Sequence, residues 1–213
     1  MVQFKFSNYA INRFIAPDAS LLTQAEIPDM SVYDKESSHW VANFCLNSML
    51  RTAWKPPYDI YMYNYLRRAE AAFREHQAAR NDTLSFVESG RQSINKYTAA
   101  LFHWEGFLSQ SDHAYTTLQK CFVLEKRYEK GDGSVLYRLN KFYNHMKHVE
   151  SRIEEGKLQE GATVAAWLTN QGLVSVDSAL SFSETGEILK DLAKWANILQ
   201  DPLSSTEKLK QHT

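Results

Sequence analysis

An arginine and a histidine seven residues apart are the residues whose types and spacing best suit a chemical role in this chain. Arg138 and His145 lie within the segment Gly131–His148. At about 100° per residue, seven residues fall about 20° short of two helical turns, so both side chains should project from one side of a helix. A guanidinium can hold two phosphate oxygens, and an imidazole can exchange a proton near neutral pH. The pair could therefore serve phosphodiester chemistry.

The helix that should carry this pair begins with clear signals. Residues Asp132–Ser134 favour a turn and an N-cap, so we expect the helix to begin near Val135 and to end near Gly156. Its apolar residues recur every three or four positions and predict a core-facing stripe: Val135, Leu139, Phe142, Met146, Val149 and Ile153. The Arg and His lie about 60 to 80° from the middle of that stripe, at its edge. An edge position allows partial desolvation while the side chain still reaches solvent.

The same part of the sequence is locally basic. Between Lys126 and Lys147 six basic residues stand against two acidic ones, a local charge of +4 in a chain whose net charge is −1. Such a patch can attract phosphates, but a pI of about 6.7 excludes the broad positive field of a dedicated duplex-binding protein. A solvated helix face with unpaired lysines would explain the same charges.

The Arg and His resemble the motif of the HEPN superfamily, in which an Arg is followed after four to six residues by a His on a late helix of a helical bundle. Arg138, the six residues LNKFYN and His145 fit that spacing. The resemblance covers roughly residues 84–155 and includes a long amphipathic segment before the motif helix. Many active members carry a polar residue directly after the Arg, whereas this chain has Leu139 there and Asn140 one step later.

This resemblance implies two related functions. The favoured one is a homodimerising module, with the motif helices of two copies brought together, that binds RNA or a protein partner such as a cognate antitoxin. The alternative is a metal-independent endoribonuclease of toxin or defence type that cleaves single-stranded RNA, with His145 as general acid or base and Arg138 stabilising the phosphate. Lys141, Asn144 and His148 are the candidate binding residues in either function. No cofactor is expected.

Two other interpretations stay open at this point. The Arg and His could simply bond to backbone or to neighbouring carboxylates at a helix boundary. A metal-binding helical bundle is the second alternative function, because Glu36 and His39 have the Glu-x-x-His spacing of di-iron bundles. Such bundles need a second copy of that spacing, which the sequence lacks. His145 and His148 could hold one side of a metal ion, but no third ligand can be named.

The rest of the chain predicts a mainly α protein, a HEPN-like bundle of up-and-down helices with a small C-terminal β-hairpin and a final helix. Four parts are expected: an irregular N-terminal arm over 1–35, a bundle core over 36–156, the hairpin plus C-terminal helix packed on the bundle over 157–203, and a frayed tail over 204–213. Before the motif helix, helical patterns cover residues 36–54, 57–81 and 82–122, the last with a possible kink near 109–112. Ser181 or Ser183 should cap the final helix.

The composition is that of an ordinary globular protein. Over 213 residues, 44% are hydrophobic and 23% are charged. No apolar run approaches the roughly 18 residues of a membrane helix, and the first residues do not form a signal peptide. Cys45 and Cys121 are far apart in apolar contexts, which favours buried, reduced thiols. We therefore expect a cytoplasmic protein with no membrane partner.

Overall fold

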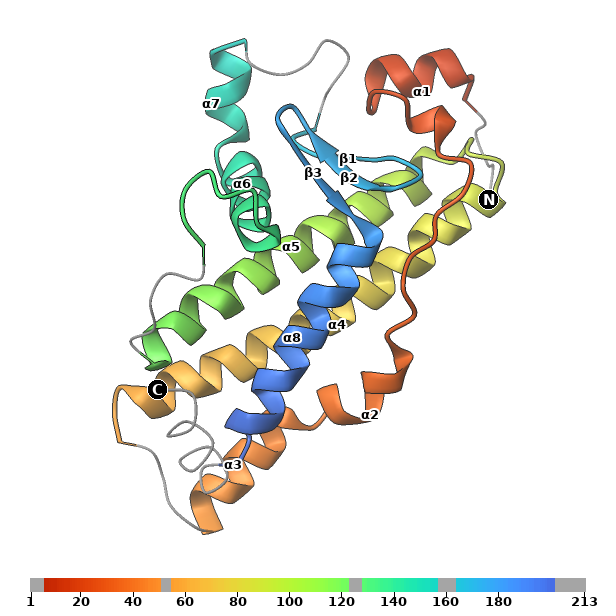
Figure 1. Cartoon of the computed structure of the whole chain (residues 1–213). Helices are drawn as coiled ribbons and strands as arrows, with labels where there is room; N and C mark the ends of the chain where they lie inside the picture. Colours follow the sequence, from red (N-terminus) through yellow and green to blue (C-terminus); the bar gives the residue numbers. More distant parts are fainter. Residues whose placement is uncertain (1–5, 51–54, 123–127, 157–163, 202–213) are drawn as a thin grey trace.

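A computed structural model describes residues 6–50, 55–122, 128–156 and 164–201 of the chain. The protein is mainly α, as the apolar periodicity predicts, and a small three-stranded antiparallel sheet precedes the last helix. Figure 1 shows two long helices running side by side through the molecule, with the other elements arranged around them. None of the helices in the described ranges is long and apolar enough to cross a membrane.

The two long helices are α4 (Tyr58–Glu88) and α5 (Ile94–Phe122). Each carries an apolar stripe, and the stripes pack against each other. At the buried contact between them, Trp104 Nε1 donates a hydrogen bond to Thr83 Oγ1 at 3.0 Å. Helix α8 (Phe182–Leu199) packs on this pair, and the buried Tyr65 hydroxyl donates to the Leu192 carbonyl at 2.8 Å. The three helices enclose most of the core.

Helix α4 differs from its predicted length. The sequence predicts one helix up to residue 81 and another from residue 82, with Asn81 and Asp82 at the boundary. Instead, α4 continues to Glu88 because Thr83 and Phe86 carry its buried stripe onward against α5, which begins only at Ile94. The chain then turns at Gly90, whose φ of 72° suits a residue without a side chain. Helix α5 runs unbroken through residues 109–112, where a kink was possible.

The N-terminal part is more structured than an irregular arm. It contains α1 (Asn8–Phe14) and two short 3-10 turns, η1 (Ala19–Leu21) and η2 (Ser31–Tyr33). Ile11 and Leu22 from this part join the core formed by the bundle. The strand pattern at the very start falls on residues 1–5, and the predicted tail on 204–213, which lie outside the described ranges.

The predicted helix over 36–54 is divided in two. Helix α2 (Asp34–Ser37) ends before Ser38, and α3 (Trp40–Leu50) follows. The second helix is anchored by the Trp40 indole, which donates to Asn197 Oδ1 of α8 at 2.8 Å. Cys45 lies exposed on α3, so the expectation of a buried thiol was wrong there, whereas Cys121 is buried as expected.

The motif helix begins where the sequence predicts. Ser134 caps α6 (Val135–Lys147) and accepts from the Tyr137 amide at 3.1 Å. The expected single helix is broken at His148, after which α7 (Val149–Glu154) continues. Figure 1 shows α6 beside α5 and the sheet.

The hairpin region forms three strands, β1 (Trp167–Leu168), β2 (Gly172–Ser175) and β3 (Ser178–Ser181), in the order β1-β2-β3. Strand β2 pairs with both neighbours, with Leu173 opposite Leu168 on one side and Leu180 on the other. Ser181 ends β3 and caps α8. It is one of the two residues, Ser181 and Ser183, that were predicted as caps. Glu184 completes a capping box by accepting from the Ser181 amide.

Candidate functional site

Arg138 reaches from α6 to the junction of β3 and α8. Its Nη1 donates to the Ala179 carbonyl at 2.9 Å and to Glu184 Oε2 at 3.2 Å, and its Nη2 donates to Glu184 Oε1. Burial alone would raise the pKa of Glu184, but hydrogen bonds from Arg138 and Ser181 lower it below its ordinary value. The guanidinium therefore uses its two terminal nitrogens on a carboxylate of its own chain.

His145 is also bound within the chain. Only 4% of the residue is exposed. Its Nε2 lies 3.2 Å from Asp177 Oδ1 in the turn between β2 and β3, and its Nδ1 lies 3.3 Å from Ser175 Oγ. Burial lowers its pKa, and the charges of Arg152 and Lys141 lower it further against the opposing effect of Asp177. The imidazole is therefore buried against the hairpin of its own chain.

The three residues predicted to assist in binding lie on α6 or at its C-terminal end, but each has different neighbours. Lys141 Nζ lies 3.1 Å from Asp177 Oδ2 and donates to the Asp177 carbonyl at 2.8 Å. The exposed Asn144 donates to Asn140 Oδ1 at 2.9 Å. His148 is exposed at the break between α6 and α7. Lys141 is thus drawn into the hairpin contacts, whereas Asn144 and His148 face solvent.

Together these contacts form a clamp between α6 and the hairpin. The positive groups of Arg138 and Lys141 are each matched by a carboxylate, Glu184 and Asp177. A phosphate that approached this flank would have to displace one of those carboxylates, at the cost of leaving a partly buried charge unpaired. Arg138 and His145 do share one flank of α6, but here they hold the hairpin and the start of α8 in place.

A second arginine and histidine come together on the opposite flank of α6, and no sequence motif marks them. We call this group the Arg68–His113 cluster. It consists of Arg68 from α4, His113 from α5, and Tyr143 and Lys147 from α6. Tyr143 Oη lies 3.3 Å from His113 Nε2, with the ring centroids 5.0 Å apart. Arg68 donates to Gln110 Oε1 at 2.7 Å, a neutral partner. Tyr143 is half-buried.

The charges of this cluster are poorly compensated. Burial is the main reason that the pKa of His113 lies below its ordinary value, and the positive charges of Arg68 and Lys147 lower it further against the opposing charge of Asp112. Burial and the neighbouring Arg67 likewise lower the pKa of Arg68. Within the described ranges, neither Arg68 nor Lys147 makes an ion pair. A phosphate placed here would gain two cations without displacing a carboxylate.

Asp112 is the carboxylate nearest to this cluster in the sequence, and its own geometry limits what it can neutralise. It is 7% exposed, and its Oδ1 accepts from Asn140 Nδ2 at 2.9 Å. Burial raises its pKa, although the bond from Asn140 and the charge of His113 act in the opposite direction. Asp112 thereby joins α5 to α6 beneath the cluster instead of pairing with either cation.

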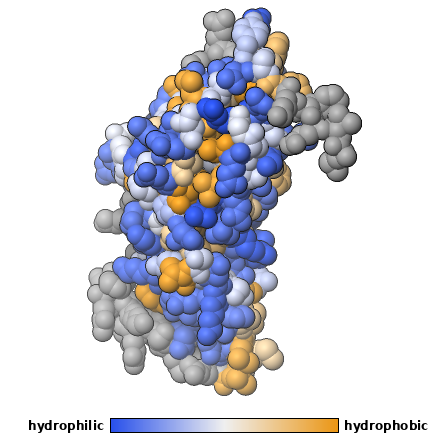
Figure 2. All heavy atoms as spheres, turned by 90° about the vertical axis from the view of Figure 1, so that its right-hand side faces the viewer, coloured by the Kyte–Doolittle hydropathy of each residue, from blue (hydrophilic) through white to orange (hydrophobic). Residues whose placement is uncertain are grey.

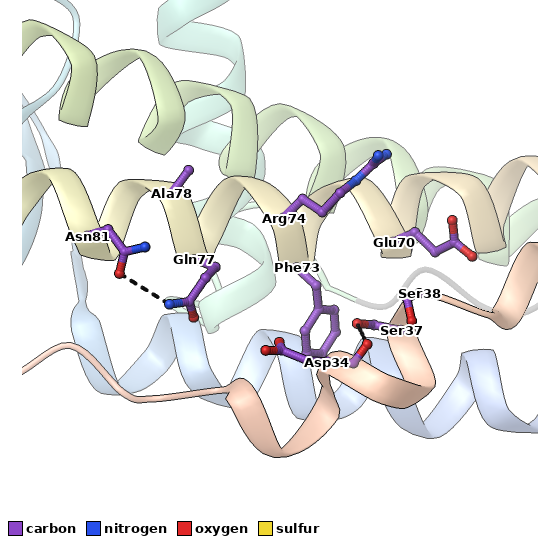
Figure 3. A pocket seen from close by; sticks show the side chains of 9 residues that line it. All are labelled: Asp34, Ser37, Ser38, Glu70, Phe73, Arg74, Gln77, Ala78 and Asn81. Carbon is purple, nitrogen blue, oxygen red and sulfur yellow. Dashed lines mark hydrogen bonds between the residues drawn. The ribbon is translucent and has the colours of Figure 1, made fainter.

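A pocket of about 480 Å³ lies between α2 and α4. Figure 3 shows the Phe73 ring extending from α4 toward α2, with the carboxylates of Asp34 and Glu70 on either side of it in this view. Glu70 accepts from the Val41 amide at 2.8 Å and so supports the start of α3. With two carboxylates and Arg74 among the lining residues, the pocket is unsuited to a polyanion.

The Glu-x-x-His pair lies elsewhere. Glu36 accepts from Asn197 Nδ2 at 2.9 Å, and His39 is exposed. His103 is held between two carboxylates of α4, with Nδ1 2.7 Å from Glu75 Oε2 and Nε2 3.7 Å from Asp82 Oδ2. Over the described ranges, no three His, Cys, Asp or Glu side chains form a group that could hold a metal ion.

Comparison with known proteins adds no relative: no family model, curated protein or solved structure matches this chain. The resemblance to HEPN proteins therefore stays a prediction that rests on the motif and on the amphipathic segment before it.

Proposed function

We propose that this protein binds single-stranded RNA without cutting it, through the Arg68–His113 cluster. The observation that carries the proposal is that neither Arg68 nor Lys147 makes an ion pair among the described residues, whereas Arg138 and Lys141 of the clamp each pair with a carboxylate. Proteins that bind single strands combine cations that follow the backbone with aromatic rings on which bases stack. Arg68 and Lys147 supply the cations, and the half-buried Tyr143 supplies the ring.

Binding of a labelled oligouridylate, measured by fluorescence anisotropy over a series of salt concentrations in EDTA, tests the proposal. We expect the double variant Arg68→Gln/Lys147→Gln to weaken binding about tenfold or more, which corresponds to about 1.4 kcal/mol. The slope of log K against log salt should fall by about 1.4, because each lost phosphate contact on a single strand contributes about 0.7.

Arg74→Gln is the matched control, since Arg74 is an exposed arginine of the same helix outside the cluster. It should leave both the affinity and the salt slope nearly unchanged. If the double variant binds as tightly as the wild type, or if Arg74→Gln weakens binding equally, the cluster is not the RNA site.

The endoribonuclease alternative makes a different prediction in the same assay. If the wild-type protein shortens the RNA in EDTA and His145→Ala abolishes cleavage while the protein stays folded, the motif is catalytic and our proposal is wrong. For that chemistry Arg138 would have to leave Glu184, and the hairpin turn carrying Asp177 would have to move from His145. The clamp geometry is the reason that we favour binding over cleavage.

A further inference from the structure

The end of the molecule formed by α3 and the start of α4 exposes large apolar side chains. We call this surface the α3–α4 patch, and its members, with their exposed fractions, are Leu46 (54%), Met49 (84%), Leu50 (72%), Tyr58 (40%), Ile60 (55%) and Tyr63 (39%). On the face shown in Figure 2 most of the surface is hydrophilic, but hydrophobic residues reach the surface at the lower tip, the end at which Figure 1 places α3. Single exposed apolar residues are ordinary, whereas a group of this size marks an interaction surface.

The patch surrounds a groove of about 460 Å³ between the two helices. Met49 from α3 and Ile60 and Tyr63 from α4 line it. Ser48 also lines it, with a buried hydroxyl that finds no hydrogen-bond partner among the described residues. Asp59 is the single charged residue among the described lining residues, and its carboxylate accepts from the Ile60 amide at 2.8 Å. The groove thus offers an apolar surface and one spare hydroxyl to an occupant.

Helix α3 exposes apolar residues in several directions. At about 100° per residue, Met49 lies on the groove side, whereas Leu46 and Leu50 lie about 60 and 100° farther around the helix. A helix that is apolar on most of its circumference is normally buried. The same short unit therefore carries both an apolar ridge and an apolar groove.

We propose that the α3–α4 patch binds the same patch of a second copy of this chain. In a two-fold arrangement the ridge of each α3 enters the groove of the other copy, so that the surface is complementary to itself. The mostly apolar character of the surface fits this occupant, because Asp59 is the single charged residue among the described residues that line the groove, so that little charge is desolvated when two such surfaces meet. This inference does not depend on RNA binding, and it places self-association away from the motif helix, whose flank is covered by the hairpin of its own chain.

The size of the patch also suits a dimer. Taking about 200 Å² for a large side chain, the six exposed fractions correspond to about 700 Å² per copy. Two copies would then bury about 1,400 Å², which lies within the range of about 1,200–2,000 Å² for stable interfaces.

Light scattering coupled to gel filtration of the full chain tests the proposal. In the micromolar range the wild type should have about twice the monomer mass of 24.6 kDa. The variant Met49→Glu/Ile60→Glu should run as a folded monomer with an unchanged circular dichroism spectrum. Val32→Glu, which replaces an equally exposed apolar residue outside the patch (77% exposed), should stay dimeric.

The natural thiol at Cys45 gives a second readout, because it lines the groove and is exposed in the single chain. Its alkylation should slow as the wild-type concentration rises and should stay fast in Met49→Glu/Ile60→Glu. A wild type that is monomeric, or a patch variant that dimerises as well as Val32→Glu does, would overturn the proposal. The first result would mean that the patch is covered within its own chain or by a different protein.

Discussion

His76 makes the free energy of unfolding depend on pH for a reason that its surroundings define. The ring is fully buried in α4 against Trp104 and Phe107. The Thr185 hydroxyl donates to the Phe182 carbonyl at 2.7 Å, so it accepts from His76 Nε2 at 3.2 Å. His76 Nδ1 is then the unprotonated nitrogen, and it has no hydrogen-bond partner among the described residues. A second proton would place an unpaired charge in the core.

The size of the effect follows from the pKa. Burial is the main reason that the pKa of His76 falls from 6.5 to about 4, and the charge of Arg80 contributes. Because the folded state has the lower pKa, the unfolded state binds the proton more tightly. Stability is therefore fully present above about pH 6.5 and is lost progressively as the pH falls toward about 4. The full contribution of His76 to the free energy of unfolding is about 3 kcal/mol, and about 2.5 kcal/mol of it is lost by pH 4.5.

Urea denaturation at pH 7 and pH 4.5 measures this loss directly. The variant His76→Phe keeps an aromatic ring among Trp104 and Phe107 but cannot be protonated. Its free energy of unfolding should fall by about 2.5 kcal/mol less than that of the wild type between the two pH values. His39→Phe, which replaces an exposed histidine, should fall as much as the wild type. Equal losses in all three proteins would refute the reasoning, because other titrating groups are common to them.

Three stability predictions concern the hairpin and its clamp, and each is checked by urea denaturation at pH 7. Gly172→Ala should destabilise the fold by several kcal/mol, on the order of 3, because an added Cβ would lie 2.1 Å from the Leu180 carbonyl oxygen. Gly131→Ala, where the added Cβ meets nothing within 4 Å, is its control, although a φ of 88° adds about 1 kcal/mol of strain. Ser181→Ala removes the capping box of α8 and should cost about 1 kcal/mol. Arg138→Ala leaves Glu184 without its main partner and should cost about 2 kcal/mol; an unchanged stability would show that this ion pair does not hold the hairpin.

Local sequence signals predicted the ends of elements well where a cap determines them. Ser134 and Ser181 begin α6 and α8 because each side chain accepts an amide of the first turn, a contact within three residues. The same kind of signal failed at Asn81 and Asp82, which favour a helix end. There the packing of Thr83 and Phe86 on α5 stabilises the helix by more than the preference of Asn81 and Asp82 for a helix end destabilises it, so α4 continues.

The partners of the motif residues could not be predicted because they come from distant segments. Asp177 reaches His145 only after the hairpin folds back onto α6, and Glu184 meets Arg138 through the capping box. Sequence spacing placed the Arg and His on one helical flank, but it holds no information on what covers that flank.

The position of the turn between α4 and α5 carries a sequence signal for part of the Arg68–His113 cluster. Two antiparallel helices joined by a short turn bring together residues about equally far from the turn. Arg68 and Gln110 lie at similar distances along the chain from Gly90, and they form a hydrogen bond. The same near-equal distance from the turn holds for Arg68 and His113, and it predicts that these two residues lie near each other. The contribution of Tyr143 and Lys147 still depends on how α6 docks on α5, which the turn does not determine.

The guanidinium of Arg138 joins three elements at one point, since it contacts the Ala179 carbonyl of β3 and Glu184 of α8 while it belongs to α6. A fluctuation that lifts α6 from the protein must therefore break the contacts of β3 and of the first turn of α8 in the same event. Amide protons in these segments should exchange with solvent at a common opening free energy, as one cooperative unit of local unfolding.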